Sequence, residues 1–236
     1  MNIKYILFDL DATLLPMNQD EFIKEYFKSL IKFLASKGYE PKKLHNAIWN
    51  SIMSVVMNDG SCTNEERFWQ EMTNNYNENV RASESLYNEY YLKYFDQNKS
   101  VCGYNESSNL VIKEAKKKGL KVVLATNPVF PRIATEHRIE WAGVDKNDFI
   151  HITTYENSCY CKPNTKYYEE ILKKIGANAN ECLMVGNDAT EDMIASMIGM
   201  KVFLLTDCLI NTKNVDISKY PNGGFNELLE YINNLD

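Results

Sequence analysis

The sequence lacks the features that would assign the chain to a membrane, secretory or nucleic-acid-binding class. No apolar stretch is long enough to span a bilayer. The apolar run after Lys4 is broken by Asp9, so it is not a signal peptide, and we expect a cytoplasmic protein without a membrane partner. The net charge is −6 and the densest basic patch, Lys116–Lys118, ends a predicted helix, so we expect no nucleic-acid partner.

Two further absences concern chemistry. The chain has no glycine-rich loop of the Walker type, which argues against a nucleotide triphosphatase of that class. Cys159 and Cys161 have no second cysteine pair and no histidine close by in the sequence, so we expect no zinc site there. We expect the six cysteines to be reduced thiols. The 236 residues, of which 44% are apolar, are enough for one large or two smaller globular domains.

The spacing of apolar residues divides the chain into a helical stretch and a region of alternating strands and helices. A short buried strand at 3–8 precedes helices from Asn18 to about Asn98, with capping boxes at Asn18 and Thr63. From about Tyr104 the pattern predicts the following elements: helices at 110–118, 133–141, 166–175, 191–198 and 226–235, and strands at 121–125, 149–152, 182–185 and 201–205. This alternation predicts an α/β fold with a Rossmann-like parallel sheet, and the helical stretch is an insertion into it.

The most informative residues are Asp9 and Asp11, which end the first apolar run, with Thr13 just beyond. The carboxyl edge of an open parallel sheet is where ligands bind. Two neighbouring carboxylates repel each other unless a cation or a proton lies between them. The alternative is an ordinary Asp-rich turn, because Asp is favoured in turns.

Polar residues recur near three later strands: Thr126-Asn127, Lys162-Pro163, and Gly186-Asn187-Asp188 followed by Asp192. The ends of parallel strands share one edge, so we expect these side chains to gather around Asp9, Asp11 and Thr13. An oxygen-rich site with few ligands suits Mg²⁺. The lysine, the hydroxyl groups and the cation together suit a phosphoryl group.

With these motifs in this order, the chain resembles the haloacid dehalogenase-like hydrolases, most closely their phosphatase branch. Members of that family whose cap is inserted between the first and second motifs usually have a helical cap there. The resemblance therefore implies a core formed by residues 1–15 and 104–236 and a helical cap formed by residues 16–103. It also implies hydrolysis of a small phosphorylated molecule with Mg²⁺ as cofactor.

The resemblance implies a role for each motif residue. Asp9 would be the nucleophile that forms an aspartyl-phosphate, and Asp11 the general acid and base. The remaining roles are these: Thr126, Asn127 and Lys162 bind the phosphoryl group; Asp9, the main-chain carbonyl of Asp11, and Asp188 hold Mg²⁺; and Thr13, Asn187 and Asp192 support the site.

The chain departs from the family pattern at two positions. Ala12 stands where glycine is common, so we expect an unstrained backbone there, because alanine does not readily take a positive φ. Asn187 precedes Asp188 where the family often has Asp directly after Gly, which leaves the metal ligand open between the two. We favour Asp188 because a carboxylate binds a cation better than an amide does.

Rival functions are a dehalogenase, a phosphomutase and a binding protein without turnover. Asp11 argues against the dehalogenase, because those relatives lack a matching residue. Met17, the aromatic residues of the first predicted helix and the segment 127–130 are candidates to line the substrate pocket. The stripe of Phe22, Tyr26 and Phe33 is, however, more typical of a bundle core.

Overall fold

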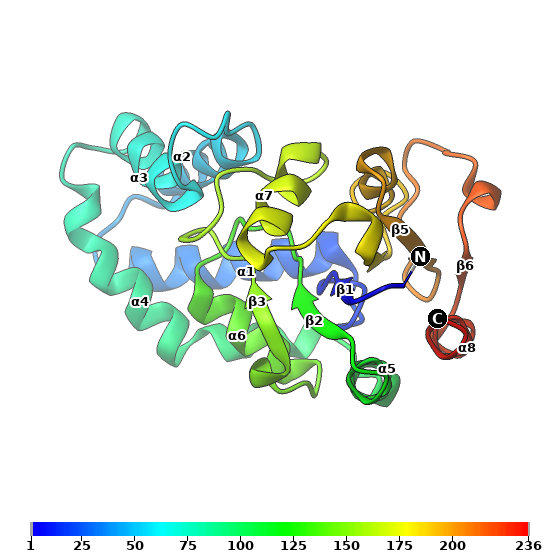
Figure 1. The fold of residues 1–236 in the computed structure, drawn as a ribbon. Coiled ribbons are helices and arrows are strands. Elements are labelled where there is room, and N and C mark those ends of the chain that lie inside the picture. Colours follow the sequence, from blue (N-terminus) through cyan, green and yellow to red (C-terminus); the bar gives the residue numbers. More distant parts are fainter. Residues whose placement is uncertain (1, 236) are drawn as a thin grey trace.

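The computed structural model describes residues 2–235 and contains one parallel six-stranded sheet of order β3-β2-β1-β4-β5-β6 (Figure 1). The strands are β1 Tyr5–Phe8, β2 Lys121–Leu124, β3 Phe149–Ile152, β4 Cys182–Gly186, β5 Lys201–Leu205 and β6 Asn222–Gly223. The α-helices are α1 Gln19–Ala35, α2 Pro41–Val56, α3 Asn64–Asn75, α4 Glu84–Lys93, α5 Glu106–Lys117, α6 Arg132–Trp141, α7 Thr165–Ile175 and α8 Phe225–Asn233. The predicted α/β fold with a parallel sheet and a helical insertion is confirmed.

The sheet is buried on both faces, which explains why its strands are nearly continuous apolar runs. Ile6 and Phe8 of β1 face a core shared with α5, α6 and α8, whereas Tyr5 and Leu7 face α7. Figure 1 shows α5 and α8 on one side of the sheet and α7 on the other. β1 lies in the middle, with Phe8 level with Leu124 of β2 and Val185 of β4. The three strands therefore end side by side.

In Figure 1, α2, α3 and α4 lie to one side of the sheet, and α1 runs from them toward β1. An antiparallel bridge joins Met17 to Cys102, and the N–H of Gly103 donates to the carbonyl of Pro16 at 2.7 Å. We call the segment between these bridge partners, residues 17–102, the helical insertion. It differs by one residue at each end from the predicted cap, whose status as a separate domain stays a prediction. Within residues 2–235, no helix is both long and apolar enough to cross a membrane.

Aromatic side chains join the helical insertion to the rest of the molecule. Phe95 stacks on Trp141 of α6 with ring centroids 5.1 Å apart, and Tyr26 of α1 meets Phe130 edge-on at 5.1 Å. These residues belong to the same buried cluster as one face of the sheet. The insertion is therefore packed against the loop that follows β2, which places α1 beside the strand ends.

Three local predictions need correction. The helix predicted over 191–198 is a short 3₁₀ segment, Met193–Ile198, which ends at Gly199 in a left-handed conformation, and 3₁₀ helices are typical of such short segments. The two-residue strand β6 was not predicted, since it is too short to show a pattern. Ala12 has φ +60°, so the expectation of an unstrained backbone there is wrong.

Candidate active site

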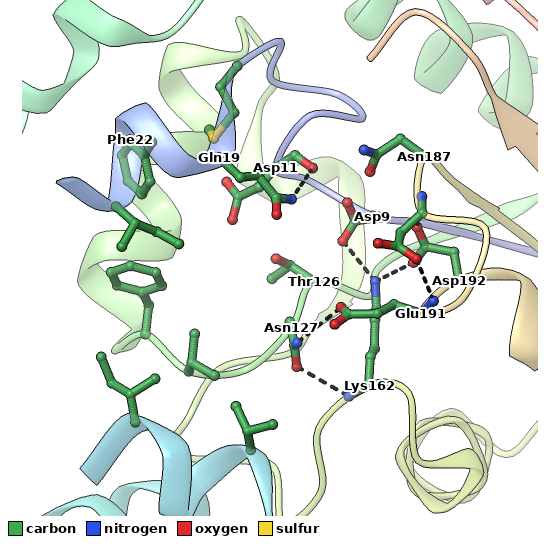
Figure 2. A pocket seen from close by; sticks show the side chains of 17 residues that line it. Asp9, Asp11, Gln19, Phe22, Thr126, Asn127, Lys162, Asn187, Glu191 and Asp192 are labelled. Atoms are coloured by element: carbon green, nitrogen blue, oxygen red, sulfur yellow. Dashed lines mark hydrogen bonds and ion pairs between the residues drawn. The ribbon is translucent and has the colours of Figure 1, made fainter. Parts of the chain in front are cut away.

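The strand ends open into one cavity of about 210 Å³ (Figure 2). Eight of the predicted site residues line it: Asp9, Asp11, Thr126, Asn127, Lys162, Asn187, Asp188 and Asp192. Thr13 does not line the cavity but bonds two side chains that do. The N–H of Asp9 donates to Val185 and that of Ala125 to Phe8, so the ladder continues to the edge of the cavity. The structure thus brings all the predicted site residues to one edge of the sheet.

Lys162 is the electrostatic centre of this edge. Its Nζ donates to Asp9 Oδ1 at 2.8 Å and to Asp192 Oδ1 at 2.6 Å, and its side chain is 1% exposed. Burial on its own lowers the pKa of Lys162, but the charges of Asp192 and Asp9 outweigh it and raise that pKa well above its usual value. Burial raises the pKa of Asp192 to about 6, against the opposing effect of Lys162. Lys162 is therefore held as an ammonium group between the two carboxyl groups.

A threonine hydroxyl connects the first and last motifs. Thr13 Oγ1 lies 3.0 Å from Asp9 Oδ2 and 3.0 Å from Asn187 Oδ1. A hydroxyl group has one proton, so it donates to only one of these two oxygens at a time. The Asn187 amide is fixed from its other end, because Nδ2 donates to the carbonyl of Cys208 at 2.8 Å. Two acceptor oxygens therefore converge on a single donor beside the nucleophile candidate.

The loop after β4 is shaped by its two aspartates. Asp188 Oδ1 accepts from the N–H groups of Thr190 and Glu191, and the N–H of Asp188 donates to Asp192 Oδ2 at 2.9 Å. A Cβ atom added to Gly186 would lie 2.1 Å from Asp192 Oδ2, so only glycine fits there. One oxygen of Asp188 thus maintains the turn while the residue still lines the cavity.

Asp11 pairs with a buried arginine. Arg138 of α6 is fully buried, donates from Nη1 to Asp11 Oδ2, and lies over the ring of Phe130 at 4.3 Å. Burial raises the pKa of Asp11, the charge of Arg138 opposes this, and the net direction is upward. Asp11 Oδ1 is buried and has no hydrogen-bond partner among residues 2–235. Asp11 therefore has one oxygen held by Arg138 and one oxygen without a partner.

Glu191 adds a further carboxyl group to the cavity wall. Asn127 Nδ2 donates to Glu191 Oε2 at 3.2 Å, and the N–H of Lys162 donates to Asn127 Oδ1 at 3.2 Å (Figure 2). Burial raises the pKa of Glu191 to about 7, and the nearby Asp192 and Asp188 charges add to this while Lys162 opposes it. Asn127 therefore ties together the loops that carry Lys162 and Glu191.

Comparison with known proteins identifies the family. Residues 3–196 match the sequence profile of the haloacid dehalogenase-like hydrolases. The chain belongs to this family. The resemblance seen in the motifs is therefore confirmed, and the protein is a hydrolase of this type. No curated protein matches the chain of this hydrolase.

Solved structures share the fold of the hydrolase at low sequence identity. A HAD phosphatase from Thermococcus onnurineus has a TM-score of 0.61 and 17% identity, and the match covers 98% of both chains. A predicted phosphoglycolate phosphatase from Haemophilus somnus 129PT has a TM-score of 0.59 and 16% identity, again over 98% of both chains. A dehalogenase has a TM-score of 0.56 and 14% identity, over 97% of this chain and 96% of its own. At these identities the likeness shows the fold alone.

The family implies Mg²⁺, and the side chains of the hydrolase fit it. Among residues 2–235, no three Asp, Glu, His or Cys side chains form a metal cluster by themselves. Mg²⁺ does not require one, because it keeps several waters and binds through one or two carboxylates. The oxygens of Asp9 and Asn187 share the single proton of Thr13, so a cation beside them would satisfy the acceptor that the hydroxyl leaves without a donor.

Sequence reasoning missed two charged residues of the hydrolase site. Arg138 lies one turn from the buried Ala134 and Trp141, so a charge on the apolar face of α6 was the available signal. Glu191 lies between the motif residues Asp188 and Asp192 but was assigned only to a predicted helix. Of the aromatic stripe expected in the bundle core, Phe22 lines the cavity, whereas Tyr26 and Phe33 pack against Tyr90.

Proposed function

We propose that this hydrolase is a Mg²⁺-dependent phosphomonoester phosphatase that works through an aspartyl-phosphate on Asp9. The observation that carries the proposal is the pair of carboxyl groups in one cavity. Asp9 is paired with Lys162, and Asp11 has a raised pKa and one buried oxygen without a partner. A carboxylate paired with an ammonium group suits a nucleophile, and a second carboxyl group with a raised pKa suits a general acid.

In the first step Asp9 attacks phosphorus and the bond to the ester oxygen breaks. Asp11 donates its proton to the leaving oxygen, and the alcohol departs. In the second step water attacks the aspartyl-phosphate, Asp11 takes a proton from the water, and Asp9 and inorganic phosphate are released. Arg138 fixes the orientation of the Asp11 carboxyl group, because it holds Oδ2.

The phosphoryl group would be bound by Lys162, Thr126 and Asn127, which line the cavity beside Asp9. Mg²⁺, held by Asp9, the main-chain carbonyl of Asp11, and Asp188, would supply the positive charge that lets an anionic phosphoryl group approach a carboxylate. The amide oxygen of Asn187 is a further candidate ligand, because it contacts the same Thr13 hydroxyl group as Asp9 does. Lys162 offsets the charge of Asp9 but is already shared with Asp192.

A dehalogenase remains the rival, because one structural neighbour is a dehalogenase. It is disfavoured by Asp11, whose carboxyl group lines the cavity and suits proton transfer to a leaving oxygen, which a departing halide does not need. A phosphomutase would use the same nucleophile but return the phosphoryl group to a sugar. Release of inorganic phosphate separates that activity from hydrolysis.

The test is turnover of 4-nitrophenyl phosphate and of a 2-haloacid, each with Mg²⁺ and with excess chelator, by the wild type and Asp9→Asn. We expect phosphate release only with Mg²⁺, and a loss of at least about 10³-fold in the variant with its circular dichroism unchanged. Asp20→Asn, an exposed carboxylate on α1, is the matched control. Halide release, or full activity of Asp9→Asn, would overturn the proposal.

A further inference from the structure

The cavity has two unlike walls. We call the residues from the strand ends, including Asp9, Asp11 and Lys162, its floor. We call the side chains that face them its roof: Met17, Phe22, Ile23, Ile52 and Val56 of the helical insertion. Figure 2 shows Phe22 across the cavity from Lys162. The loop after β2 extends the roof with Val129 and Phe130. Catalysis at the floor would place the leaving group of a substrate against these apolar side chains.

The cavity offers no cation for a second charge on the substrate. Lys162 is the only cationic side chain among the described residues that line it, and its ammonium group is already bound to Asp9 and Asp192. Arg138, which is bound to the cavity residue Asp11, is fully buried over the ring of Phe130. The carboxyl groups lining the cavity number five: Asp9, Asp11, Asp188, Glu191 and Asp192.

An anion on the leaving group would therefore be unpaired against an apolar wall. Burial of an unpaired charge is strongly unfavourable, and carboxylates on the floor would add repulsion. The one polar side chain that the helical insertion contributes is Gln19, whose Nε2 lies 3.5 Å from the carbonyl of Asp11. An uncharged apolar group, by contrast, gains from burial against Phe22, Ile52 and Val56. The cavity of about 210 Å³ suits a group of about one ring, since drug-sized pockets start near 300 Å³.

Building on the proposed phosphatase activity, we infer that the substrates are phosphomonoesters of small, uncharged, apolar alcohols or phenols. Phosphorylated acids and bisphosphates are excluded as substrates, because their second negative charge would lie unpaired against the apolar roof. Phosphoglycolate carries a carboxylate where the roof is apolar. This hydrolase therefore differs in substrate class from its structural neighbour, which is described as a predicted phosphoglycolate phosphatase.

A matched pair of substrates tests the charge alone. 4-Carbamoylphenyl phosphate and 4-carboxyphenyl phosphate have nearly the same size, and only the second carries an extra negative charge. We expect kcat/KM with Mg²⁺ to be about 10-fold or more higher for the carbamoyl ester, and phosphoglycolate to be poorer still. Equal kcat/KM for the two aryl esters, or phosphoglycolate as the best substrate, would overturn the inference while leaving the phosphatase proposal intact.

A variant of the roof should cancel the preference. Val56 is the last residue of α2, where a lysine is compatible with the helix dipole. Val56→Lys should raise kcat/KM for the carboxy ester relative to the carbamoyl ester by about 10-fold, because it supplies the missing cation. Val56→Met, which adds length without charge, should keep the wild-type ratio. If Val56→Lys leaves the ratio unchanged, the roof does not contact the leaving group. If no ester is hydrolysed at all, the proposed function itself fails.

Discussion

The floor and the roof of the cavity enclose the same space but are stabilised by different forces. On the floor, Lys162, Asp9 and Asp192 are joined by ion pairs and hydrogen bonds, and Thr13 and Asn127 link the loops between them. The roof is held by apolar and aromatic packing, in which Phe22 packs edge-on against Phe95 with centroids 6.5 Å apart. A charged network permits few substitutions, whereas apolar packing accepts many of similar volume.

This contrast suggests different roles for the two walls of the cavity. The charged residues of the floor suit a reaction step that is the same for every substrate. A roof that depends on shape can differ between relatives while the reaction stays the same. Substitutions on the floor should therefore change rate, and substitutions in the roof should change preference or stability.

The largest effect is expected at Lys162. Lys162→Met leaves the buried carboxylates of Asp9 and Asp192 unpaired, so we expect the free energy of unfolding to fall by about 3–5 kcal/mol. Phosphatase activity should fall to background. Urea denaturation and phosphate release measure the two effects. Lys116→Met removes an exposed pair with Asp148 and should cost under about 1 kcal/mol. Equal stability of the two variants would contradict the view that buried ion pairs stabilise the floor.

The second-largest effect is expected at Asp11, where two substrates with different leaving groups test its role as the acid. Asp11→Asn keeps an oxygen for Arg138 but cannot donate a proton, so we expect kcat to fall by about 10²–10⁴-fold. The free energy of unfolding should fall as well, because the buried Arg138 loses its charged partner. The loss should be smaller for 4-nitrophenyl phosphate than for an alkyl phosphate, because a good leaving group needs less protonation. An equal loss for both substrates would show that Asp11 is not the acid.

The helical insertion also holds a buried polar cluster, which lies away from the cavity. Ser29 Oγ lies 3.0 Å from Asn98 Oδ1 and 3.0 Å from the carbonyl of Tyr26, and it also contacts the hydroxyl of Tyr90. Ser29→Ala leaves those groups short of a partner, so we expect a loss of about 1–3 kcal/mol in unfolding free energy. Because none of these residues lines the cavity, kcat/KM should not change. Ser100→Ala, at an exposed site, is the control. A changed kcat/KM in Ser29→Ala would contradict the view that this cluster affects stability alone.

The parts of the fold predicted from sequence are those with local signals. Buried strands, capping residues and the polar residues that follow β1, β2 and β4 are each visible within a few positions. The pair of Arg138 and Asp11 spans 127 positions, and no local pattern connects them. Glu191 was assigned to a helix because its spacing allowed one, whereas the side chain of Asp188 determines that turn. The φ of Ala12 depends on the closure of the loop around it, which residue type alone does not reveal.

That loop gives the smallest expected effect. Ala12 has φ +60°, a region that costs an L residue about 1–2 kcal/mol, and its methyl group is buried. Ala12→Gly relieves the strain but loses about 0.8 kcal/mol of methyl burial and gains unfolded-state entropy, so the contributions nearly cancel. We expect a change within about 0.5 kcal/mol in urea denaturation. Ala115→Gly, an equally buried helical position in α5, should lose about 1–2 kcal/mol. Equal losses in the two variants would mean that Ala12 does not take a left-handed backbone in solution, and the loop that presents Asp11 would then differ from the one described.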